Sequence, residues 1–156
     1  AGGLHNALPG RATVDQSLIS QTAMQNATNL SFAIVGAEEW VANAYLNVGA
    51  LLSTTGIQVA VDVPAGATLD LVVSVSCESV DTVNGFYVRR TTIDDAAVNF
   101  TASNMTNCNN ALVHMSLRVV NASTNGNVQI RFAQSTSSAS ALIIRRGSHM
   151  IAHRIL

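Results

Sequence analysis

Residues 141–156 read ALIIRRGSHMIAHRIL and decide the fold. Ala141–Ile144 is an apolar, β-branched run, and Arg145–Ser148 is a polar break whose glycine suits a tight reversal. From Met150 to Ile155 the side chains alternate with a period of two, which predicts a strand rather than a helix. We therefore expect a closing hairpin whose last strand lies in a sheet and ties down the end of the chain.

The composition suits a single β domain with an aliphatic core. The 156 residues are 48% hydrophobic, 11% charged and 4% aromatic. This length fits one domain, and the apolar content excludes a disordered chain. A surface so poor in charge indicates burial against other subunits, solvation by the abundant Ser, Thr and Asn side chains, or both.

The charges argue against nucleic acid as a partner. The net charge is −1 and all eight basic residues are arginine, so no basic face attracts a phosphate backbone. The lack of lysine either is chance or marks a surface of amides and hydroxyls, as on extracellular or virion proteins.

Residues 1–30 differ from the rest and are predicted to form a helical stem. Between residues 14 and 28 there is no glycine or proline, and five residues fall on one heptad seam. An apolar seam that turns into amides and a hydroxyl fits a trimeric coiled coil, where polar seam residues favour one register. A plain linker is the alternative. The seam residues are Val14, Leu18, Gln21, Gln25 and Thr28.

Residues 31–156 are predicted to form an all-β, antiparallel domain. Alternation is clearest in Ile57–Val63 and Leu69–Cys77, and the short turn Pro64–Gly66 between them predicts a hairpin. About eight to ten strands at roughly 8–14-residue spacing favour a Greek-key or jelly-roll sandwich over a meander. The other expected strands are residues 31–36, 45–52, 87–93, 98–101, 112–120 and 128–132.

Two cysteines are too few for a disulfide framework. Cys77 ends an alternating run, a position typical of a buried free thiol, whereas Cys108 lies in a polar loop. A single bridge between them is the alternative.

The sequence contains no pattern typical of catalysis or metal binding. His149 and His153 have the spacing of a metal pair on a helix, but on a strand they lie about 13 Å apart. The acidic doublets Glu38–Glu39 and Asp94–Asp95 are expected to be solvated turn charges. We expect no enzyme activity, no metal and no cofactor.

Two arginine pairs are candidates for a subunit contact or a bound anion. Neighbours on a strand face opposite ways, so one arginine of each pair should point to a core or an interface, where an unpaired charge is costly. In an oligomer it would pair with a carboxylate or anion from the next subunit. Exposed arginines at strand ends are the alternative. The pairs are Arg89 with Arg90 and Arg145 with Arg146.

Two polar loops, residues 103–110 and 135–140, are expected to be exposed tips. Their candidate contact residues are Asn104, Asn107, Asn109, Ser137 and Ser138. Asn-x-Ser/Thr sequons would carry glycans in a secreted protein, although a chain rich in these residues makes sequons by chance. They begin at Asn26, Asn29, Asn99, Asn104 and Asn121.

A helical stem that leads into an all-β head closed by its own last strand resembles two groups of proteins. These are the trimeric heads of bacteriophage tail fibres and tail needles, and the jelly-roll family of tumour necrosis factor (TNF) and C1q. The segments that carry the resemblance are Val14–Thr28, Ile57–Cys77 and residues 141–156. The likeness is closest to the knob at the tip of podovirus tail needles. The aromatic-rich signatures of the animal domains are absent, which favours the phage group over the animal one.

The resemblance implies a homotrimer in which three TNF-like jelly rolls pack side by side behind a coiled stem. It implies a structural component of the virion, at the tip of a phage tail needle or fibre. Such a tip contacts the host envelope, recognises a receptor or penetrates, and plugs the genome channel. Implied partners are further copies, a bacterial cell-surface component and, through the stem, other tail proteins; the protein would act outside the cell. The alternative is a secreted TNF/C1q-like or lectin-like trimeric binding module.

Overall fold

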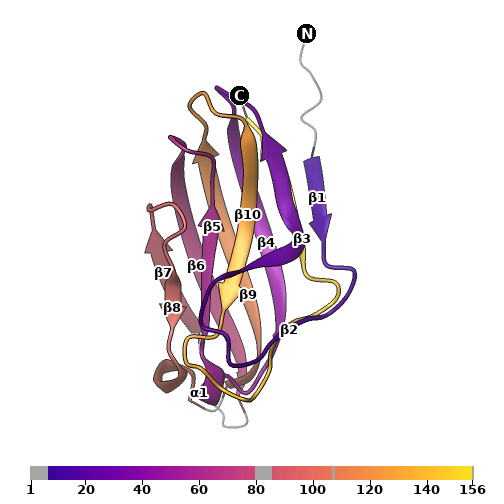
Figure 1. Ribbon diagram of the computed structural model, residues 1–156, viewed down its shortest axis with the longest axis vertical. Coiled ribbons are helices and arrows are strands. Elements are labelled where there is room, and N and C mark those ends of the chain that lie inside the picture. Colours follow the sequence, from indigo (N-terminus) through magenta and orange to yellow (C-terminus); the bar gives the residue numbers. More distant parts are fainter. Residues whose placement is uncertain (1–6, 80–85, 107, 156) are drawn as a thin grey trace.

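The computed structural model describes residues 7–79, 86–106 and 108–155, which form an antiparallel sandwich of two sheets (Figure 1). The large sheet has the order β1 (Ala7–Arg11), β12 (His149–Arg154), β4 (Glu39–Gly49), β9 (Cys108–Val120), β6 (Thr68–Ser79) and β7 (Phe86–Thr91). The small sheet has the order β3 (Gln25–Ile34), β10 (Gly126–Ala133), β5 (Ile57–Asp62) and β8 (Val98–Phe100).

Four short elements complete the fold. Strand β11 (Leu142–Ile144) pairs with β2 (Gln16–Leu18) and with β4. The helix α1 (Leu52–Thr55) packs against the 3-10 helix η1 (Ala102–Met105) at one end of the sandwich. Within the described ranges, no helix is long and apolar enough to cross a membrane.

The main strands pair in a nested order. β1 pairs with β12, β3 with β10, β4 with β9, and β5 with β8. When β2, β11 and the β6–β7 hairpin are set aside, the first strand pairs with the last, the second with the second last, and so on. One long antiparallel hairpin has this order when it is rolled up so that successive strand pairs lie alternately in the large and the small sheet.

The core between the sheets follows from the alternation within the strands. In β4, Trp40, Leu46 and Val48 are buried, and the residues between the buried positions are half-buried or exposed. Trp40 packs across the sandwich on Phe32 of β3, with ring centroids 5.3 Å apart. Each fully buried aliphatic side chain contributes about 1.5–3 kcal/mol, so the aliphatic alternation supplies most of the stability.

The prediction of a hairpin from Ile57 to Cys77 is wrong in its pairing, although both strands exist. β5 lies in the small sheet and β6 in the large one, so the turn at Pro64 crosses from one layer to the other. A short turn limits the distance between two strand ends. It does not decide whether the strands share hydrogen bonds or bury their apolar faces against each other, which is the outcome here.

The closing hairpin is also wrong in its pairing. β11 and β12 both pair with β4, with Ile144 opposite Val48 and His149 opposite Tyr45. The break at Arg145–Ser148 is therefore an interruption along one edge of β4 rather than a reversal. The expectation that the last strand lies inside a sheet is confirmed, since β12 pairs with β1 on one side and β4 on the other.

The buried Ser148 repairs the ladder at this interruption. Its Oγ accepts a hydrogen bond from the Asn47 N–H (2.9 Å) and donates one to the Arg145 carbonyl (2.8 Å). Gly147 has a φ of 93°, a conformation that favours glycine. Gly147 thus allows the chain to bulge at this point, and Ser148 Oγ accepts the hydrogen bond of the Asn47 N–H in place of a backbone carbonyl.

The helical stem is wrong. Val14 lies after β1, Leu18 in β2 and Gln21 between β2 and β3. Gln25 and Thr28 belong to β3, which continues through residue 30 into the domain. In β3 a bulge separates the buried Ala27 and Leu30, and Gln129 Nε2 fills it by donating to both of their carbonyls. The bulge replaces the period of two by a spacing of three, which imitates a helix.

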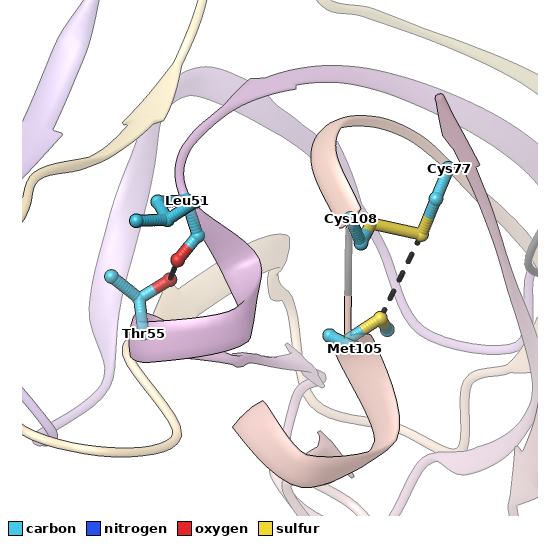
Figure 2. Close-up of a disulfide and its surroundings, with 5 residues drawn as sticks. All are labelled: Leu51, Thr55, Cys77, Met105 and Cys108. Carbon is cyan, nitrogen blue, oxygen red and sulfur yellow. Dashed lines mark hydrogen bonds between the residues drawn. A yellow bond between two sulfur atoms is a disulfide. The ribbon is translucent and has the colours of Figure 1, made fainter. Parts of the chain in front are cut away.

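Cys77 and Cys108 form a disulfide (Figure 2), so the free-thiol interpretation is wrong and the single bridge is right. The bridge joins the neighbouring strands β6 and β9, because β9 begins at Cys108 instead of after a polar loop. Both cysteines are buried, and the Sδ of Met105 in η1 lies 3.8 Å from the Sγ of Cys77.

Candidate functional site

The large sheet buries one face and leaves the other open, and this open side is the outer face. We define the outer face by the side chains of β12, β4, β9, β6 and β7 that point away from the core. Alternation along β9 places Leu112, His114 and Ser116 on it, because Val113 and Met115 are fully buried. The inward alternation that builds the core thus also decides which residues meet solvent.

Three rings stack across the middle of the outer face. Tyr45 of β4 lies between its cross-strand neighbours His114 of β9 and His149 of β12. Its ring centroid is 4.7 Å from that of His114 and 5.2 Å from that of His149, with interplanar angles of 11° and 29°. The Nε2 of His114 lies 3.0 Å from Asn43 Oδ1. Cross-strand ring pairs of this kind stabilise a sheet and hold the face rigid.

Apolar side chains surround the ring stack. Leu112 is 48% exposed, Ile151 41%, Val72 37% and Val88 54%. The register brings Ser116 and Asn43 between Val72 and Ile151, and Ser74 between Val88 and His114. Among the side chains that the structure describes, the centre of the outer face therefore combines aliphatic, aromatic, amide and hydroxyl groups and carries no Asp, Glu or Arg.

The charges that the structure describes on the outer face stand at its margin. Four of them form two ion pairs, and the Arg145 guanidinium lies over Gly49 of β4 and donates to Asn110. Arg90 of β7 donates two hydrogen bonds to Asp70 of β6, at 2.9 and 2.8 Å, and these bonds hold the pKa of the Asp70 carboxyl below its ordinary value. Arg118 of β9 contacts Glu39 of β4 at 2.6 Å. Asp70 and the two arginines border a shallow recess of about 260 Å³, whose lining includes Val72.

The four candidate arginines are all exposed within one subunit. The Arg89 guanidinium lies 5.6 Å from the ring centre of Phe100 in β8, while Arg90 is on the outer face. Arg145 donates to Asn110 Oδ1 at 3.2 Å. Arg146 contributes its backbone N–H to the Asp15 carboxylate at 2.6 Å. None is driven into the core of the single chain, and the subunit contact of one of these arginines stays a prediction.

The expected tip residues differ in their location and exposure. Asn104 lies in η1, is exposed and accepts a hydrogen bond from Thr101 Oγ1 at 2.7 Å. Asn109 belongs to β9 and is half-buried, so it is not a loop tip, and Asn107 lies outside the described residues. Ser137 is exposed and Ser138 half-buried in the loop after β10.

A buried glutamine, which sequence reasoning missed, organises the loop after β10. Gln134 is 0% exposed, and its Nε2 donates to the carbonyls of Ser138 (3.2 Å) and Ser140 (2.7 Å) and, at 3.4 Å, to that of Leu18. Its Oε1 accepts from the N–H groups of Gln21 and Ser138, both at 3.1 Å. In the sequence, the one feature that indicates the burial of Gln134 is its position directly after the apolar end of β10.

The sequons also differ in accessibility. The side chains at Asn26, Asn29, Asn99 and Asn104 are exposed. Asn121 is 3% exposed, and its Nδ2 donates to the carbonyls of Val35 (2.7 Å) and Thr124 (2.9 Å). A glycan on that nitrogen is incompatible with this fold. In the part of the chain that the structure describes, no three His, Cys, Asp or Glu side chains are placed to hold a metal ion.

Comparisons with known proteins assign no family and no function to the chain. No protein-family model matches the sequence, and no curated protein matches it. The chain is similar to one from the structure of infectious bursal disease virus Gx strain, with 10% identity, a TM-score of 0.21, and coverage of 97% of this chain and 41% of that one. A second similar chain comes from the infectious bursal disease virus VP2 subviral particle, with 12% identity, a TM-score of 0.21, and coverage of 96% and 39%. This chain thus spans about two fifths of those chains, and at these TM-scores the similarities support no inference about function.

Proposed function

We propose that this chain is the head of a virion structural protein, at the tip of a bacteriophage tail needle or fibre, and that it acts as a homotrimer. The observation that carries the proposal is the outer face, whose uncharged centre has the composition of a subunit interface. Interface cores are depleted in charged residues and enriched in aromatic ones, and charges gather at the rim. Tyr45 lies at the centre of this face and the Arg90–Asp70 pair at its margin.

The nested strand order supports a TNF-like jelly roll as the architecture of this head. The first main strand, β1, pairs with the last, β12, and β12 also pairs with β4. Both β1 and β12 are therefore held in hydrogen-bonded ladders, which suits a rigid tip that meets a cell envelope. The work of such a tip would be contact and mechanical support rather than catalysis, without a cofactor.

The expected contact loops support a receptor-facing end. α1 and η1 pack together, and the Thr136 N–H in the loop after β10 donates to the Thr55 carbonyl at 2.9 Å. Asn104 in η1 and Ser137 in the loop after β10 are thus exposed at the end of the sandwich where α1 lies. We assign this end to a bacterial cell-surface component and the N-terminal segment to other tail proteins, with the protein located in the virion.

The subunit count tests the proposal first. Light scattering on the purified chain at micromolar concentration should give about 49 kDa, three times the 16.3 kDa of one chain. Fluorescently labelled trimer should then bind intact cells of some strains in a bacterial panel, and a double variant Asn104→Ala, Ser137→Ala should bind less. A monomer in solution, or a trimer that binds no strain, would overturn the proposal.

The second candidate is a secreted TNF/C1q-like or lectin-like trimeric module. The disulfide favours it, because disulfides persist in oxidising compartments, although virion surfaces are also such an environment. The exposed sequon at Asn99 also favours a secreted module. Glycan mass on Asn99 in native material would favour the secreted module, and an unmodified mass would favour the virion head.

A further inference from the structure

We propose that the disulfide and η1 form a redox-sensitive clamp, made of Cys77, Cys108 and Met105, at the end of the sandwich where α1 lies. The bridge holds η1 in place, and a dithiol reductant that opens the bridge loosens this end. The inference rests on the proposed function, because Asn104 of η1 belongs to the end that we assign to a cell-surface component. It adds a chemical partner and a means of regulation to that end.

The bridge closes an irregular end of the ladder between β6 and β9. Cys108 is the first residue of β9, and Cys77 lies two residues before the end of β6. The register shifts between Glu78 and Ser79, so the pairing is irregular beyond Cys77. Strand ends open more often than strand centres, because fewer contacts hold them. The covalent bond therefore fixes an end that backbone hydrogen bonds alone would hold less well.

η1 has few attachments of its own. It is a single turn of four residues, which is too short to be stable in isolation. Among the described residues, the N–H and O–H hydrogen bonds of residues 101–106 stay within that segment, as from Thr106 Oγ1 to the Ser103 carbonyl at 3.0 Å. Packing, rather than hydrogen bonding, therefore holds η1 on the sandwich.

That packing centres on Met105. Its side chain is fully buried, and its Sδ lies 3.8 Å from the Sγ of Cys77 (Figure 2). We treat this as a packing contact, because a disulfide sulfur carries no hydrogen to donate. η1 also packs against α1. The bridge is thus part of the surface on which η1 lies, and η1 in turn covers the bridge.

Reduction of the bridge requires that η1 move away. The attacking thiolate must reach a sulfur atom, and Cys77 and Cys108 are only 8% and 2% exposed. The attack breaks the S–S bond, and one cysteine leaves as a thiolate that takes a proton from the reductant. The second thiol of the reductant then displaces the mixed disulfide, which leaves two cysteine thiols and an oxidised reductant. The bacterial periplasm, where disulfides persist, also contains dithiol proteins that exchange them.

Two methionine variants test whether η1 covers the bridge. Met105→Ala removes the side chain beside Cys77, and Met115→Ala removes an equally buried methionine from the interior of β9. Both variants lose similar packing, so both lower the global stability. With excess dithiothreitol under native conditions, reduction should be about tenfold faster in Met105→Ala than in Met115→Ala, counted by alkylation and protein mass. Equal rates in the two variants would overturn the covering role of η1.

Hydrogen exchange tests whether the bridge holds η1. Exchange over residues 101–106 should be about tenfold faster in the reduced wild type than in the oxidised one. Ile34→Ala, at a buried position of β3, lowers global stability away from the clamp and should leave this exchange unchanged. Unchanged exchange after reduction, or an equal acceleration in Ile34→Ala, would overturn the clamp. Neither measurement depends on the subunit count, so such a failure leaves the proposed homotrimer standing, and a monomeric wild type overturns only the homotrimer.

Discussion

Loss of the disulfide should lower the stability of this domain by several kcal/mol. The bridge between Cys77 and Cys108 closes a loop with a sequence separation of 31 residues. It joins strands that are already neighbours in the native sheet, so cutting it leaves the native hydrogen bonds in place. The main consequence falls on the unfolded chain, which gains conformational freedom when the loop opens.

The magnitude follows from the entropy of loop closure. For a loop of this length the chain-entropy relation gives about 12 cal/mol/K, or about 3.7 kcal/mol at 25 °C. For a domain of this size 1 kcal/mol corresponds to roughly 2–4 °C in Tm, so reduction should lower Tm by roughly 7–15 °C. Loss of the buried packing around Met105 in an alanine variant would add to this value.

Urea unfolding of the oxidised protein, the reduced protein and the double variant Cys77→Ala, Cys108→Ala measures the effect. All three need the same protein concentration, because assembly would couple stability to concentration. The reduced wild type keeps every atom of the core and is therefore the control for packing. Equal unfolding free energies for the oxidised and reduced chains, or two alkylatable thiols in the denatured oxidised protein, would refute the reasoning.

Three further predictions concern polar side chains. Gln134→Ala should cost about 2–4 kcal/mol in urea unfolding, because it leaves buried backbone groups without partners; the exposed Ser137→Ala is its control, and equal losses would contradict the role of Gln134. Burial raises the pKa of Glu38, but hydrogen bonds from Val35 N–H and Trp40 Nε1 and the ion pair with Arg154 outweigh it, so the pKa is lowered in the folded state. The stability from Glu38 should thus be full above the unfolded pKa of about 4.5 and be lost as pH falls through the folded pKa, and Glu38→Gln should flatten this acid dependence in thermal melts. In protein secreted from eukaryotic cells, peptide mass mapping should find glycan on Asn99 and none on the buried Asn121; a folded product modified at Asn121 would contradict the structure.

The pairing of strands was beyond the reach of the sequence. Ile57–Val63 and Leu69–Cys77 alternate as strands in isolation, but whether they share a sheet depends on which layer each joins. The same holds for Cys77 and Cys108, which meet only because β6 pairs with β9. A pairing partner is a property of residues far apart along the chain, and no local pattern encodes it.

The sequence by itself determined that this is an all-β chain with an aliphatic core. The reason is that the alternation of side chains is set within each short segment, and the apolar side chains of all segments together make up the core. It also determined that the residues from Met150 to Arg154 enter a sheet. Only the tertiary structure decided that residues 14–28 form no helix, because β2 pairs with β11 and the bulge at Ala27–Leu30 in β3 is stabilised by Gln129 from another strand. Only the tertiary structure brought Tyr45, His114 and His149 into one stack, since each ring comes from a different strand. Local alternation fixes which way a side chain points, and long-range pairing fixes what stands beside it.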